Sequence, residues 1–278
     1  MAERDASWRL TACALARAPC YGVPASIQGA DPVRLDFATA KAPSATRVSF
    51  YGWLALAAIT LSVAAFGPSL VSSSQRRGSM TVMAGTHAVL MSAWLILYLI
   101  QTMLAANGGI GLHKRLGVAG AVVAAAAVAT GFAATVAMVQ RGFDLSGDLS
   151  RPPNDSALDA AIFQFSNLAI FSILVGAALA LRRRRHIHKR LMAFAVIETL
   201  MAAPLGHLVG HFGLPVLTFV LWGLGVLGAF LAHDIRTVKR VHPVTLILGI
   251  GLVALANLEA IVIGPSARWH RVLEWLAG

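Results

Sequence analysis

The sequence has few charged residues, fewer acidic than basic ones, and almost no cysteine. Asp, Glu, Lys and Arg make up 13% of its 278 residues, whereas a soluble globular domain carries roughly a quarter. This shortage argues against a water-soluble domain of any fold class. The two cysteines, Cys13 and Cys20, match neither a disulfide framework nor a zinc motif. The composition therefore favours a protein whose solvent is the lipid bilayer.

Long apolar stretches make up most of the chain, which is 57% hydrophobic with a mean hydropathy of +0.71. A helix needs about 20 apolar residues to cross the hydrocarbon core of a membrane. Seven stretches meet this length, at 50–71, 80–106, 116–139, 160–181, 191–211, 212–232 and 243–264. The sequence therefore predicts an all-α, polytopic transmembrane helix bundle of about seven spans. The fifth and sixth spans abut, and one long broken helix is the alternative there.

Basic residues predict the orientation of this bundle. Of the 23 lysines and arginines, 17 fall in the N-terminal segment and the loops on the same side, and 6 fall on the other side. The positive-inside rule then predicts a cytoplasmic N-terminus and an external C-terminus. Because the basic residues form short blocks between apolar runs, the net charge of +11 does not indicate nucleic acid binding. The expected partners are the lipid bilayer and, in one interpretation, other membrane subunits.

Three regions are expected along the chain. Residues 1–47 contain no span and predict a disordered cytoplasmic tail. Residues 48–264 form the transmembrane helical domain. Residues 265–278 combine Trp269 and Leu273 with Arg268 and Arg271, a pattern typical of a short helix at the membrane interface.

Few ionisable residues lie inside the predicted spans, where they are costly and therefore candidates for function. They are His87, Glu198, His207 and Glu259. At ~1.5 Å per residue, His87, His207 and Glu259 lie roughly 6 to 11 Å below the predicted outer boundary, level with Asn167. Such a group could hold a metal ion, ligate a haem iron or pass protons. The alternative is a polar patch that only joins helices.

Glu198 lies about 10 Å from the predicted cytoplasmic end of its span. It is a candidate proton relay together with Glu259. The alternative role for Glu198 is a protonated carboxyl group that bridges neighbouring helices. The sequence leaves both roles open.

A short motif opens two of the predicted helices. Leu112-His113-Lys114-Arg115-Leu116 recurs as Ile187-His188-Lys189-Arg190-Leu191, with a weaker copy at Val241-His242-Pro243. The repeat predicts related helical hairpins. His113 and His188 would form a histidine layer on the inner side, which either contacts anionic lipid headgroups or supplies axial ligands to a b-type haem.

With these motifs, residues 50–264 resemble a widespread group of uncharacterised bacterial multi-spanning inner-membrane proteins. Proteins of this group combine a histidine in an early span with His-basic-basic-Leu motifs that open later helices. The chain is also loosely similar to cytochrome b561-type haem proteins, which place paired histidines near both faces of a helical bundle. The first resemblance implies a multi-pass protein of the bacterial inner membrane, and the second implies haem b.

Three functions are compatible with these residues. The first is electron transfer by a b-type haem or a metal, with His87 and His207 as main ligands, Glu259 beside them, and His113 and His188 as further haem ligands. The second is a proton-coupled carrier of a small molecule or ion, in which Glu198, His207 and Glu259 exchange protons. The third is a membrane subunit or scaffold without chemistry of its own. Whether the protein is an enzyme stays open at this point.

Overall fold

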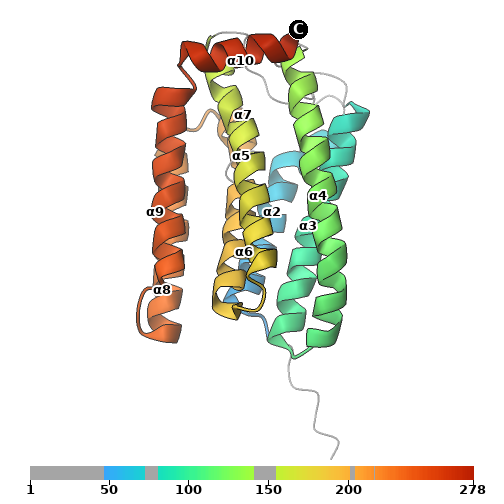
Figure 1. The fold of residues 1–278 in the computed structure, drawn as a ribbon, viewed down its shortest axis with the longest axis vertical. Coiled ribbons are helices and arrows are strands. Elements are labelled where there is room, and N and C mark those ends of the chain that lie inside the picture. The colour runs from blue at the N-terminus through green and yellow to red at the C-terminus, as the bar shows by residue number, and fades with distance from the viewer. Residues whose placement is uncertain (1–46, 73–80, 141–154, 201–203, 216) are drawn as a thin grey trace, which may run out of the picture. The chain divides into compact units, whose positions relative to one another are not determined.

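The computed structural model describes residues 47–72, 81–140, 155–200, 204–215 and 217–278. The predicted tail, residues 1–47, lies outside these ranges except for its last residue. All regular secondary structure within them is helical, as the sequence predicts. The helices are α2 (Phe50–Val71), α3 (Val82–Ala106), α4 (Ile110–Gln140), α5 (Asp155–Ala180), α6 (Arg185–Leu200), α7 (Gly206–Phe212), α8 (Leu217–Val238), α9 (Pro243–Leu258), the π-helical turn η3 (Glu259–Ile263) and α10 (Ala267–Ala277). Figure 1 shows the long helices running side by side as a bundle.

Six helical segments among the described residues are long and apolar enough to cross a membrane. They are α2, α3, α4, α5, α8, and α9 together with η3. The helices are therefore those of a multi-pass membrane protein. The predicted fifth span, 191–211, falls on α6 and α7, which lie on either side of residues 201–203. In Figure 1, α6 begins at the lower end of the bundle and α7 lies nearer the upper end. A seventh span formed by α6 and α7 stays a prediction.

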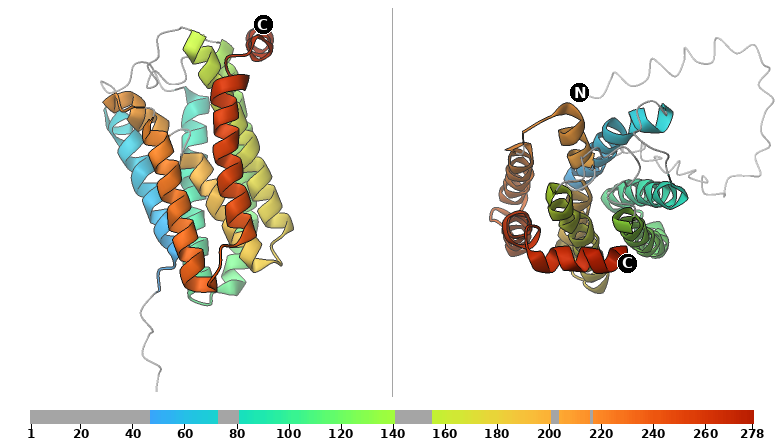
Figure 2. Two further views of the ribbon diagram at one scale, coloured as in Figure 1. Left: turned by 90° about the vertical axis from the view of Figure 1, so that its left-hand side faces the viewer. Right: turned by 90° about the horizontal axis from the view of Figure 1, so that it is seen from above.

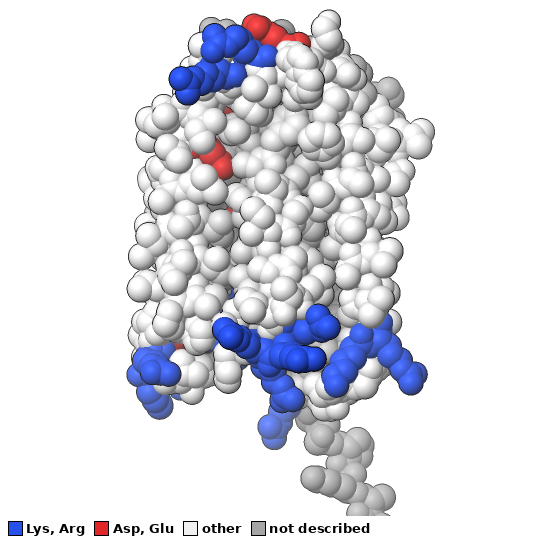
Figure 3. Space-filling view, in the orientation of Figure 1, with Lys and Arg blue, Asp and Glu red and all other residues white. Residues whose placement is uncertain are grey.

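On the face shown in Figure 3, basic side chains gather at the two ends of the bundle, and the band between them is almost free of them. We call the end where α4, α6 and α9 begin the cationic end. Its exposed basic residues are Arg47, Lys114, Arg115, Arg182, Arg183, Arg184, Arg185, Arg236, Lys239 and Arg240. At the opposite end, α10 carries Arg268 and Arg271. Short basic blocks at helix ends, separated by an apolar band, suit a protein whose middle lies in lipid.

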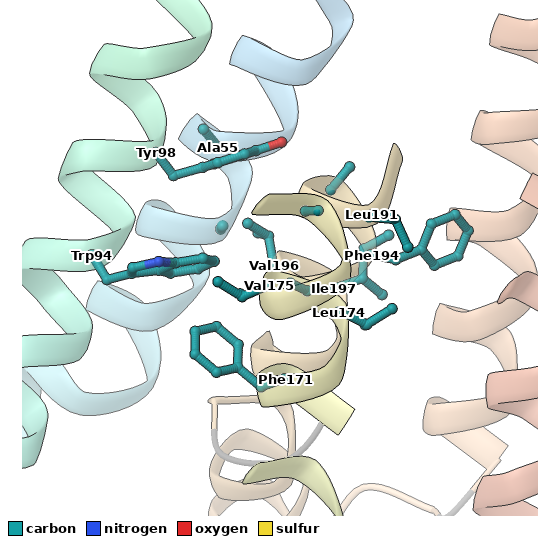
Figure 4. Close-up of a cluster of buried hydrophobic side chains, with 14 of the residues drawn as sticks. Ala55, Trp94, Tyr98, Phe171, Leu174, Val175, Leu191, Phe194, Val196 and Ile197 are labelled. Carbon is teal, nitrogen blue, oxygen red and sulfur yellow. The ribbon is translucent and has the colours of Figure 1, made fainter. Parts of the chain in front are cut away.

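The main hydrophobic core lies where α2, α3, α5 and α6 meet. Figure 4 shows Trp94 of α3 beside Phe171 of α5, and their ring centroids are 4.8 Å apart in an edge-to-face arrangement. Small side chains allow close helix packing here, since Ala55 of α2 and Ala195 of α6 are completely buried. The α6 helix is apolar on all sides from 193 to 197 and fully surrounded there, as expected for a central helix.

The bounds of α8 differ from the predicted sixth span, 212–232, at both ends. Gly213 adopts a left-handed conformation with φ of 61°, ends α7 and leads to Pro215, so α8 starts only at Leu217. At the other end, α8 continues beyond Asp234. The predicted span stops just before Asp234, and the helix can continue past this residue because its charge is paired inside the protein.

The last helix, α10, lies across one end of the bundle (Figures 1 and 2). The Ser266 side chain caps its start by accepting a hydrogen bond from the Trp269 amide. Leu273 is 1% exposed and packs against Met138 of α4 and Ala161 of α5. Trp275 is 78% exposed. The helix therefore covers the bundle with one apolar face and offers an aromatic residue to its surroundings.

Candidate functional site

Two buried carboxyl groups come together between the cationic end and α10. Glu198 lies on α6 and is 8% exposed, and Glu259 lies on η3 and is 4% exposed. The two side chains are close enough to interact electrostatically. A hydrogen bond also joins Glu259 to Ser166 of α5. Three helical elements thus contribute one polar side chain each to this site, which we call the carboxyl pair.

Glu259 is positioned by an irregular turn at the end of α9. The Gly264 amide donates to the Glu259 carbonyl oxygen at 2.8 Å, which closes the π-helical turn. A Cβ atom on Gly264 would lie 2.6 Å from the carbonyl oxygen of Asp159, so only glycine lets the end of α9 approach the start of α5 this closely. Short π-helical turns often occur at functional sites. The sequence prediction included Glu259 but missed its partner Ser166, because only the fold brings α5 next to η3.

His87, a predicted ligand, packs against α4 and α5. Its Nδ1 lies 2.9 Å from the carbonyl oxygen of Ala127, and because a carbonyl oxygen only accepts, Nδ1 is the protonated nitrogen. A Cβ atom on Gly131 would lie 2.7 Å from His87 Cε1 and 2.8 Å from a methyl carbon of Leu168. The glycine therefore makes room for the imidazole between these helices.

His207, the other main predicted ligand, lies on α7. Its ring centroid is 5.1 Å from that of Phe66 on α2, whereas His87 packs against α4 and α5. Within the described residues, no three His, Cys, Asp or Glu side chains are grouped so that they could hold a metal ion. The geometry therefore adds no support to the predicted metal site at His87, His207 and Glu259.

The two histidines of the repeated motif lie next to each other at the cationic end. The ring centroids of His113 and His188 are 6.5 Å apart. His113 Nδ1 lies 3.2 Å from the Gln101 carbonyl oxygen, and His188 Nδ1 lies 2.8 Å from the Ala178 carbonyl oxygen. Each histidine thus reaches back from the start of a helix to the end of the preceding one. This shared contact is structural evidence that the two hairpins are related.

This hydrogen bonding fixes the chemistry of the two rings. Since Nδ1 carries the proton in each ring, Nε2 carries the free electron pair. Metal-bound histidines commonly show this arrangement, with the second nitrogen bound to a backbone carbonyl. The third copy of the motif differs, because His242 Nδ1 accepts a hydrogen bond from the Val244 amide and caps α9.

A buried ion pair forms a second polar network at the cationic end. Arg190 of α6 pairs with Asp234 of α8, and their side chains are 1% and 0% exposed. The guanidinium also donates to Thr245 Oγ1 of α9 at 3.0 Å, and the Thr245 hydroxyl donates to Asp234 at 2.6 Å. The second carboxylate oxygen of Asp234 accepts from the His242 amide at 3.1 Å. The network therefore joins α6, α8 and α9, and its charges are matched.

This network was not predicted, although the sequence contains a signal for it. Arg190 was expected only as part of the repeated motif, and neither Asp234 nor Thr245 was a candidate. Asp234 is the only acidic residue between Glu198 and Glu259, and it stands within a strongly basic stretch. An isolated acid in a basic loop is a candidate partner for one of the neighbouring arginines.

Two basic groups near this network, Lys189 and His242, have pKa values below their ordinary ones. Lys189 Nζ lies 5.2 Å from the centroid of the Tyr51 ring. Partial burial and then the nearby charge of Arg190 lower the pKa of Lys189 below its ordinary value. Burial and then Arg190 also lower the pKa of His242. Both groups therefore lose their protons more readily than in water.

Comparison with protein-family models, with curated proteins and with solved structures gives no match. The resemblances inferred from the short histidine motifs stay expectations. The functional argument for this chain therefore depends on the geometry of its own residues.

Proposed function

We propose that the protein is a proton-coupled membrane carrier of a small molecule or ion, and that Glu198 and Glu259 exchange the protons. The observation that supports this proposal is the carboxyl pair itself, because both groups are buried and the charge of Glu259 acts on Glu198. Two negative charges this close in a poorly polarisable interior repel each other strongly. Each carboxyl group can hold or release one proton, so the pair can pass a proton between α6 and η3.

The surroundings of the pair suit reversible proton exchange. Ser166 offers a hydroxyl group that both donates and accepts, and it contacts Glu259. Among the described residues, no basic side chain forms an ion pair with either glutamate, in contrast to Asp234. A salt bridge would hold a carboxyl group in its ionised state. A hydroxyl partner can bond to the carboxyl group in either its protonated or its ionised state. The pair therefore has the chemistry of a relay.

Proton uptake into vesicles tests the proposal. Purified protein is reconstituted into liposomes that contain a pH-sensitive dye, and a potassium diffusion potential with valinomycin drives protons inward. We expect Glu198→Gln and Glu259→Gln to reduce uptake to the level of protein-free vesicles, because an amide cannot carry the proton. Glu274→Gln on exposed α10 is the matched control and keeps wild-type uptake. Equal uptake by all variants, or none by the wild type, contradicts the proposal.

A second candidate, electron transfer by a b-type haem, is favoured by the His113–His188 pair. In both rings Nδ1 contacts a backbone carbonyl oxygen, and the ring centroids lie 6.5 Å apart. These two residues would hold the haem iron, which would supply one-electron chemistry. An absorption spectrum of the detergent-purified protein tests this. A Soret band that disappears in His113→Ala and His188→Ala supports the haem, and a preparation that stays colourless after haem addition contradicts it.

We also propose that the cationic end faces the cytoplasm of a bacterial inner membrane, since basic residues favour that side. Two variants without the native cysteines report the orientation, one with Lys239→Cys and one with Arg268→Cys. Each is treated with a membrane-impermeant thiol reagent. The reagent should label position 268 in intact spheroplasts and position 239 only after lysis. The reverse labelling contradicts the proposed orientation.

A further inference from the structure

Two buried tyrosine side chains lie on the neighbouring helices α2 and α3. Tyr51 lies in the first turn of α2 and is 8% exposed, and Tyr98 lies on α3 and is 5% exposed. Their side chains are close enough to interact electrostatically. Neither hydroxyl oxygen has a hydrogen-bond partner among the described residues. A buried hydroxyl group without a partner is destabilising, and each case requires an explanation.

Packing holds both rings in place. The indole of Trp94 stacks on the Tyr98 ring, with the centroids 6.0 Å apart and the planes at 13°. Figure 4 shows Tyr98 extending from α3 to Ala55 of α2, which is one helical turn beyond Tyr51. The centroid of the Tyr51 ring lies 6.3 Å from that of Phe230 and 5.2 Å from Lys189 Nζ. Neither hydroxyl can therefore reach bulk water by a simple rotation of its side chain.

Both tyrosines belong to a core cluster of buried, mostly apolar residues. Ala55, Ala58 and Val196 are 0% exposed, and Trp94 is 2% exposed. A ligand between the hydroxyls must therefore be very small. It must also both donate and accept hydrogen bonds, because a phenol group does both.

We propose that the hydroxyl groups of Tyr51 and Tyr98 bind an internal water molecule. Water is the smallest molecule that both donates and accepts, and a buried water usually has two to four polar partners. A third partner is available, since the side-chain oxygen of Gln101 is also buried without a partner. Gln101 follows Tyr98 by three residues and so lies on the same face of α3.

This water site lies beside the Arg190–Asp234 network. Tyr51 interacts electrostatically with both charges of the ion pair. A water molecule bound to Tyr51 therefore continues the polar interior of the cationic end from α6 and α8 to α3. The site is independent of the proposed proton exchange, because it uses neither glutamate of the carboxyl pair.

Thermal unfolding of three variants tests whether the hydroxyls have a partner. Phenylalanine keeps the ring and removes only the hydroxyl group. With a bound water, Tyr51→Phe and Tyr98→Phe each lower the midpoint by about 2–4 °C, and the double variant loses less than the sum of the two. If the hydroxyls have no partner, each substitution raises the midpoint and the effects add, which overturns the proposal.

Infrared spectroscopy distinguishes a water from a direct bond between the two tyrosines. The wild type should show an O–H stretching band that shifts when the sample is exchanged into H₂¹⁸O. The band should be absent from Tyr98→Phe. A spectrum without such a band overturns the proposal even if the two substitutions are coupled. Neither measurement depends on proton uptake, so failure of the water site and failure of the carrier function can be told apart.

Discussion

The two polar regions inside this bundle differ in how their charges are matched. At the cationic end, the Asp234 carboxylate pairs with Arg190 and accepts hydrogen bonds from the Thr245 hydroxyl and the His242 amide. In the carboxyl pair, Glu198 faces another acid, Glu259. Burial is nearly complete in both regions. Burial alone therefore does not distinguish these acids, whereas the sign of the charge beside them does.

The largest effect is expected from breaking the matched network. Asp234→Leu leaves the Arg190 guanidinium buried without a counter-charge, which should destabilise the fold by about 3–5 kcal/mol. The double variant Arg190→Met/Asp234→Leu removes both charges and should recover most of this loss. Thermal unfolding in one detergent measures both changes. A double variant that is less stable than Asp234→Leu would show that the ion pair contributes much more than charge neutralisation.

A second prediction concerns the packing of His87 in the other half of the bundle. Gly131→Ala places a methyl group 2.7 Å from His87 Cε1 and 2.8 Å from Leu168, and such overpacking should cost about 1–3 kcal/mol. Gly120→Ala on the same helix is the matched control, because nothing lies within 4 Å of its added Cβ. The control should be neutral or slightly stabilising, since alanine favours helix. Equal melting temperatures for the two variants would contradict this account of Gly131.

Apolar length and charge blocks predict most of this fold, because in lipid only helices satisfy their own backbone hydrogen bonds. The predicted stretches 80–106 and 243–264 nearly coincide with α3 and with α9 plus η3. The predicted sixth span stops at 232, just before Asp234, whereas α8 continues to Val238. Sequence periodicity cannot reveal that this acid is neutralised by a residue 44 positions earlier.

The candidate site was predictable only in part, for a similar reason. Glu198 and Glu259 stand out in a sequence because charge is rare in apolar spans. Their mutual contact and the hydrogen bond from Ser166 depend on a helix end that approaches another backbone closely at Gly264. The tyrosine pair had no comparable signal, since Tyr51 fits equally well as an aromatic residue at a membrane interface.

A third prediction contrasts the two kinds of acid directly. Glu198→Gln keeps the shape of the side chain and removes one of two like charges, so the fold should be unchanged or more stable by about 1 kcal/mol, a rise of 2–4 °C. Asp234→Asn is the comparison, and it should lower the midpoint because Arg190 loses its counter-charge. Both midpoints are measured in the same detergent. A loss of stability in Glu198→Gln as large as in Asp234→Asn would show that Glu198 is also a structural acid.

The smallest effect is expected at the ion pair that joins α10 to α5. His270 Nε2 lies 2.8 Å from Asp159, and the two side chains are 26% and 33% exposed. Partly solvated pairs contribute only about 0–1 kcal/mol, so His270→Ala should barely change the melting temperature. The helix should stay docked, because Leu273 is buried and the Trp269 indole donates to the Leu158 carbonyl at 3.0 Å. Limited trypsin cleavage after Arg268 and Arg271 reports the docking, and Leu273→Ala should speed this cleavage strongly. If His270→Ala speeds cleavage as much as Leu273→Ala does, the ion pair holds α10 in place and exposed charge matters more here than burial.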